Sequence, residues 1–164
     1  MAYSRIVVDD GTREVPIANK YGKEICKIYF RPTDYSIIDR YDKVMARLDK
    51  ILEPLSGVVI ERDGSAQNST DWKLLKSVEK KLKEEINYLF DMDEADMIFA
   101  TRDPFSSVHG EFFCTNVLNA LGAFMKAAFE EEARLANERI SEYTSDLPDD
   151  PEVTEDAGAA SDNA

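Results

Sequence analysis

Few side chains in this 164-residue sequence are suited to catalysis or metal binding. It has one histidine, His109, and two widely separated cysteines, Cys26 and Cys114. A zinc site or a disulfide scaffold needs more such residues at closer spacing. No nucleophile motif surrounds His109, so we interpret it as an exposed loop residue. Cys114 follows two phenylalanines, which favours a buried structural thiol over a reactive one.

Carboxylates cluster without the spacing that a metal or a glycosidase would need. The run Asp91–Asp96 resembles the start of a calcium loop, but the sixth position is Asp96 and the twelfth is Arg102. An EF-hand needs glycine and glutamate there. Asp39 and Asp42 are three residues apart, like many surface acids, which does not indicate a glycosidase pair. The sequence also has no phosphate-binding glycine loop. The sequence therefore predicts no catalytic residue, no metal site, no cofactor and no enzyme.

The charge balance is strongly acidic. The chain has 20 Lys and Arg against 33 Asp and Glu, a formal net charge of −13. The lysines of Lys73–Lys83 are interspersed with Glu79, Glu84 and Glu85, as on the solvated face of a helix. No stretch is apolar for about 18 residues, and Met1–Val8 is not a secretory signal. We therefore expect a cytoplasmic protein that binds neither nucleic acid nor membrane.

The acidic character is greatest at the C-terminus. Residues 144–164 hold seven acids, no base and two prolines, with only Leu147 and Val153 as sizeable apolar residues. Such a segment buries too little surface to offset the cost of ordering it. We predict one domain over residues 1–143 and a disordered acidic tail over 144–164.

Short strands are predicted within residues 5–30. Arg5–Val8 and Thr12–Ile17 flank Asp10-Gly11, a dipeptide suited to a tight hairpin. Glu24–Phe30 then alternates apolar and polar residues. Pro16 restricts its strand to a sheet edge. We expect a small N-terminal hairpin or sheet backed by helices.

Helices follow in the order about 34–53, 71–90, 94–100 and 111–143. Apolar residues recur every three or four positions in the three long helices, which is the period of one helix face. In the first these are Ile37, Tyr41, Val44, Leu48 and Ile51. The predicted fold class is mainly α, with three main helices and a small N-terminal β element.

The last helix is the most informative element. It would be about 50 Å long, more than the diameter of a compact body of this size, about 40 Å. It should therefore bend, break or project. One thin stripe follows its whole length: Leu118, Gly122, Met125, Phe129, Ala133, Ala136, Ile140 and Tyr143. We interpret it either as the incidental alanines of an exposed helix or as a contact for another helix, from a second copy or a partner.

Three segments together resemble a known family. They are YGKEICKIYFRPTDYSIIDRYDKVMARLDKIL at 21–52, LLKSVEKKLKEEINYLFDMDEADMIF at 74–99 and FFCTNVLNALGAFMKAAFEEEARLANERI at 112–140. In this order they resemble the tail assembly chaperones of long-tailed, siphovirus-type phages and prophages of Gram-positive bacteria. The resemblance covers about residues 20–143. Asp91-Met92-Asp93 stands where the family pattern has glycines.

The resemblance implies a helical protein of the host cytoplasm that is absent from the mature virion. It would bind the tape measure protein, keep it soluble and help recruit tail tube proteins. Apolar grooves suit that task better than catalytic groups do. The stripe residues are then the candidate partner-binding residues, and homo-oligomerisation is compatible with them.

Two other functions fit the same sequence. One is a structural tail or head–tail component that stays in the particle. The other is an acidic inhibitor that mimics DNA, although the acids outside the tail are interspersed with bases.

Overall fold

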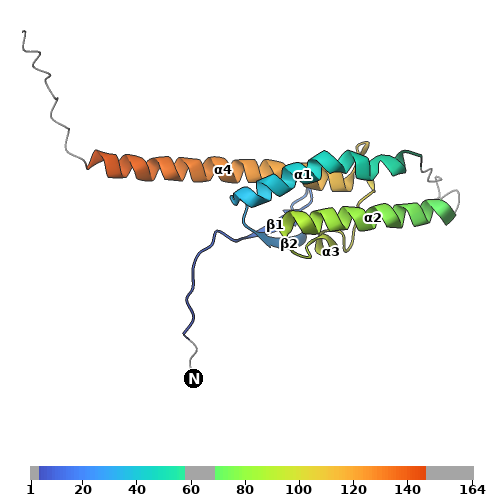
Figure 1. Cartoon of the computed structure of the whole chain (residues 1–164), viewed down its shortest axis with the longest axis horizontal. Coiled ribbons are helices and arrows are strands. Elements are labelled where there is room, and N and C mark those ends of the chain that lie inside the picture. Colours follow the sequence, from blue (N-terminus) through green and yellow to red (C-terminus); the bar gives the residue numbers. More distant parts are fainter. Residues whose placement is uncertain (1–3, 58–68, 147–164) are drawn as a thin grey trace, which may run out of the picture. The chain divides into compact units, whose positions relative to one another are not determined.

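The computed structural model describes residues 4–57 and 69–146, and it is mainly helical with a small N-terminal antiparallel β-hairpin (Figure 1). The elements are β1 (Arg13–Ala18), β2 (Glu24–Phe30), α1 (Tyr35–Leu52), the 3₁₀ turn η1 (Glu53–Gly57), α2 (Ser69–Phe90), α3 (Ala95–Ile98), β3 (Ser107–Val108), β4 (Glu111–Phe112) and α4 (Phe113–Ser145). The predicted fold class is confirmed. The predicted acidic tail lies almost entirely outside the described residues. The chain divides into two units after Glu130.

The N-terminal hairpin pairs β1 with β2 across a turn at residues 19–23. Asn19 organises this turn, because its Oδ1 accepts the backbone N–H of Tyr21 at 2.9 Å and that of Lys23 at 3.0 Å. Gly22 supplies the positive φ of 79° that a side chain would disfavour. As predicted from the alternation, Ile28 and Phe30 are buried on one face of β2.

The predicted strand at Arg5–Val8 is wrong, and so is the hairpin at Asp10-Gly11. The N–H of Gly11 donates to Asp9 Oδ1 and that of Thr12 to Asp10 Oδ1, both at 3.0 Å. A two-residue hairpin would need the Thr12 N–H for the Asp9 carbonyl. The side-chain bond occupies that donor, and residues 4–12 form no strand.

Helices α1 and α2 lie side by side (Figure 1). Asp34 caps α1 by accepting the Ser36 N–H at 2.9 Å. Arg40 Nε donates to the Leu89 carbonyl at 2.9 Å, which satisfies one of the free carbonyls in the last turn of α2.

The end of α2 uses a left-handed residue that is not glycine. Asp91 has a φ of 55°, and the Met92 N–H reaches back to the Asn87 carbonyl at 3.2 Å. Asn87 Oδ1 also accepts the N–H of Ala95 at 2.9 Å, at the start of α3. This short helix occupies only four residues of the predicted range 94–100.

A second hairpin, β3–β4, was not predicted. Its two-residue turn is His109-Gly110, with φ values of 54° and 86°. Glu111 pairs in this hairpin, so α4 begins two residues later than the predicted 111. The N–H of Phe113 donates to the Ser106 carbonyl at 2.9 Å, which ties the hairpin to the start of α4.

One core joins the sheet to the three long helices. Its most deeply buried large side chains are Ile28, Val44, Val78, Leu82, Ile86, Leu89, Ile98 and Leu118. Burying each contributes about 1.5–3 kcal/mol. Within the described ranges, no helix has the length and hydropathy to span a membrane. Helix α4 runs from Phe113 to Ser145 and is uninterrupted at Gly122.

Candidate helix-binding surface

The eight stripe residues lie on one face of α4. Successive members are three or four residues apart, which is the period of one helix face at 3.6 residues per turn. We call this line the α4 stripe: Leu118, Gly122, Met125, Phe129, Ala133, Ala136, Ile140 and Tyr143. Its environment differs between the two halves.

The first half is covered by α1. Leu118 and Met125 are buried, and the Tyr41 hydroxyl donates to the Leu118 carbonyl at 3.0 Å. The Tyr41 ring passes over Gly122 so closely that a Cβ there would lie 2.8 Å from Tyr41 Cζ and closer still to the hydroxyl oxygen. Burial raises the pKa of the Tyr41 hydroxyl. Gly122 is therefore small because this chain's own helix packs on it.

The start of α1 packs against Phe129. The ring of Tyr35, the first residue of α1, lies 5.6 Å from the ring of Phe129, centroid to centroid. From Tyr41 back to Tyr35, the contacts move along α4 from Gly122 to Phe129, so the two helices run antiparallel. Within the first unit, α1 therefore packs on the stripe from Gly122 to Phe129.

The second half of the stripe is exposed. Every residue from 131 to 146 is exposed, including Ala133 and Ala136. Ile140 keeps 60% of its accessible surface and Tyr143 keeps 77%. We call these four residues, Ala133, Ala136, Ile140 and Tyr143, the open stripe.

Charges flank the open stripe, and acids outnumber bases. The acids are Glu130, Glu131, Glu132, Glu138 and Glu142, and the bases are Arg134 and Arg139. Arg134 Nη2 lies 2.6 Å from Glu131 Oε1, and its other terminal nitrogen bonds Glu138. These pairs are exposed and contribute little to stability. The excess of acids over bases gives a local negative potential beside the open stripe.

The residues considered for catalysis do not converge on one place. His109 is exposed in the β3–β4 turn, whereas Cys114 is buried in the core. Burial raises the pKa of the Cys114 thiol to about 11. Asp39 pairs with Lys43 at 2.6 Å on an exposed surface, and exposed Asp96 pairs with the half-buried Lys83 at 3.1 Å. Across residues 4–57 and 69–146, no three His, Cys, Asp or Glu side chains are grouped as metal ligands would be.

Sequence reasoning missed one unusual carboxyl group. Glu94 is only 7% exposed, and its Oε2 has no hydrogen-bond partner among the described residues. Desolvation raises the pKa of this carboxyl. Glu94 is one acid within an acidic run, and nothing in the pattern distinguishes it from its solvated neighbours.

Comparison with known proteins does not narrow the choice of function. The chain matches no protein-family model, no curated protein and no solved structure. The function is therefore inferred from the residues and their arrangement.

Proposed function

We propose that this protein is a tail assembly chaperone of a long-tailed phage or prophage. It binds the helical tape measure protein through the open stripe and keeps it soluble while tail tube proteins are recruited. The observation that supports this proposal best is the open stripe itself, in which Ile140 and Tyr143 are largely exposed. In this proposal the protein acts in the host cytoplasm and is absent from the virion.

The packing of α1 on the first half of the stripe indicates how a partner helix can pack on the open stripe. There α1 places Tyr41 over Gly122 and Tyr35 against Phe129. Ala133 and Ala136 also lack bulk beyond Cβ, so a partner helix can approach closely. From Ala133 to Tyr143 the open stripe spans about 15 Å, or about three turns. That length suits anchors on a partner helix at positions i, i+3, i+4 and i+7.

The flanking charges specify the chemistry of the partner. Five acids and two bases between residues 130 and 142 favour a helix with an apolar seam flanked by Lys and Arg. Exposed charges of this kind act mainly on the association rate, and salt screens them. Added salt should therefore slow complex formation more than it speeds dissociation.

The net charge also suits a chaperone. A formal charge of −13 opposes self-association and would help keep an apolar coiled-coil rod in solution. The resemblance of three segments of the sequence to tail assembly chaperones supports the same function.

The test replaces two small stripe residues with charged ones. Ala133→Glu with Ala136→Glu puts two carboxylates into the apolar line, so we expect tape measure binding to be lost. Glutamate is a good helix former, so helicity by circular dichroism should be unchanged. The matched control, Ser141→Glu with Ser145→Glu, adds the same charge to α4 away from the stripe.

Binding is measured by pull-down after co-expression with the neighbouring long coiled-coil protein. Loss in the stripe variant and retention in the control would support the proposal. Equal binding by both variants would place the partner surface elsewhere.

A further inference from the structure

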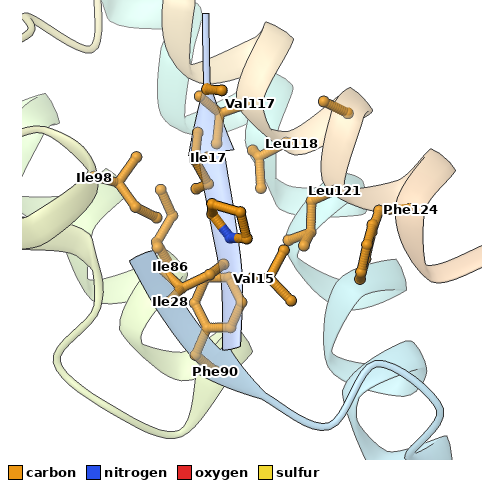
Figure 2. A pocket seen from close by; sticks show the side chains of 13 residues that line it. Val15, Ile17, Ile28, Ile86, Phe90, Ile98, Val117, Leu118, Leu121 and Phe124 are labelled. Carbon is orange, nitrogen blue, oxygen red and sulfur yellow. The ribbon is translucent and has the colours of Figure 1, made fainter. Parts of the chain in front are cut away.

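An apolar groove of about 250 Å³ lies beside β1 (Figure 2). It is lined by residues of β1, β2, α2, α3 and α4, and all of them are apolar. They include Val15 and Ile17 of β1 and Ala120, Leu121 and Phe124 of α4. Such a space favours an apolar occupant over water.

The groove follows the free edge of β1. Both the inward residues Val15 and Ile17 and the outward residues Pro16 and Ala18 line it. In Figure 2, β2 lies on one side of β1, and Leu121 and Phe124 of α4 lie on the other. The hairpin has two strands, so no strand among the described residues pairs with the β1 edge that faces α4.

A matching apolar segment stands exposed in the same chain. Ile6, Val7 and Val8 are 93%, 80% and 74% exposed. Three consecutive β-branched residues have high strand propensity and are unfavourable in water. We call residues 5–8 the N-terminal arm.

We propose that the N-terminal arm of a second copy occupies this groove, adding a strand to the free edge of β1, and that reciprocal exchange forms a two-fold dimer. The arm does not fold back on its own β1, because the Thr12 N–H that would close that hairpin is bonded to Asp10 Oδ1. Gly11 is likewise held by Asp9. The arm is extended and the groove lies open, which is the arrangement of a strand-exchanged protomer.

Strand alternation decides which side chains enter the groove. Ile6 and Val8 point to one face of an extended arm, and Val7 points to the other. Benzene fits an engineered cavity of about 150 Å³, so 250 Å³ holds two branched side chains. Pro16 has no N–H and shortens the hydrogen-bond ladder at this edge. Apolar contact by Ile6 and Val8 is therefore the main source of affinity.

Light scattering on the full chain gives the first test. The wild-type mass should be twice the 18.6 kDa of one chain. Ile6→Asp with Val8→Asp should halve that mass, whereas Val7→Asp should leave it unchanged. On the groove side, Ala120→Phe should fill the space and also give monomers. Ala123→Phe, on the same helix but outside the groove lining, should remain dimeric.

Cysteine trapping separates exchange between copies from folding back. A tagged chain with Val8→Cys is mixed with an untagged chain with Ala120→Cys and then oxidised. A disulfide between the two chains is expected. The proposal is overturned by a monomeric wild type, by an Ile6 and Val8 variant that keeps the dimer mass, or by a disulfide that forms only within a chain carrying both cysteines. None of these readouts requires the tape measure protein, so this inference and the proposed function fail separately.

Discussion

At the scale of single residues, Gly122 is the position where a side chain is least tolerated. Alanine normally stabilises a helix relative to glycine by about 1 kcal/mol. Here its Cβ would meet the Tyr41 ring, and overpacking costs about 1–3 kcal/mol. We expect Gly122→Ala to lower the free energy of unfolding by about 1 kcal/mol in urea titrations. In a Tyr41→Leu background the same change should be neutral or stabilising, and an equal loss in both backgrounds would contradict the packing account.

Asp91 occupies a backbone conformation that suits glycine. Its φ of 55° costs about 1–2 kcal/mol for a residue with a Cβ, against about 0.5–1 kcal/mol for the greater chain entropy of glycine. Asp91→Gly should therefore raise the urea midpoint by the equivalent of about 0.5–1 kcal/mol. Asp93→Gly, without a positive φ to relieve, should be neutral or destabilising. If Asp93→Gly raised the urea midpoint more than Asp91→Gly did, the end of α2 would not be strained.

Glu94 should make stability depend on pH. Its carboxyl pKa is raised in the folded protein above the ordinary value of 4.5, because burial disfavours the charged form. The native state then binds more protons than the unfolded state, so this contribution is complete below pH 4.5 and is lost as the pH rises through the folded pKa. Glu94→Gln removes the charge, and its stability advantage over wild type should grow from acid to neutral pH. If the stability advantage of Glu94→Gln did not change with pH, the raised pKa of Glu94 would be excluded as its cause. The control is Asp93→Asn, which removes an exposed carboxylate.

At the scale of elements, helical period was the strong predictor. The stripe of α1 was predicted from spacing, and its residues Ile37, Val44 and Leu48 are buried. The predicted hairpin at Asp10-Gly11 does not form, because the side-chain oxygens of Asp9 and Asp10 accept the backbone N–H groups of Gly11 and Thr12. Dipeptide propensity does not distinguish that bonding pattern from a closed hairpin. The β3–β4 hairpin was missed because two paired residues per strand are too few to show alternation.

The candidate surface was predictable only as a line of residues on α4. Spacing identified all eight stripe positions. Which of them are covered depends on where α1 starts relative to Phe129, a tertiary contact between distant segments. The higher proportion of charged residues after Phe129 is the one sequence signal that separates the covered stripe residues from the exposed ones. No pattern identifies the groove beside β1, since five separate elements line it.

At the scale of the whole molecule, the two proposals use different surfaces. The open stripe lies at residues 133–143, and the groove is lined by residues between Val15 and Phe124. A partner helix and a second copy therefore do not compete for the same residues. Dimerisation would present two open stripes to one rod, which raises apparent affinity when both can bind together. The monomeric Ala120→Phe variant should then hold the rod protein more weakly than Ala123→Phe does.

The central claim is that the open stripe holds a helical rod protein in solution. It is tested most directly by co-expressing this chain with the neighbouring long coiled-coil protein and measuring the soluble rod after pull-down. The account predicts a soluble complex with wild type and with Ser141→Glu/Ser145→Glu, and an insoluble rod with Ala133→Glu/Ala136→Glu. A rod that stays insoluble with every variant, or that is equally soluble with all of them, would contradict it.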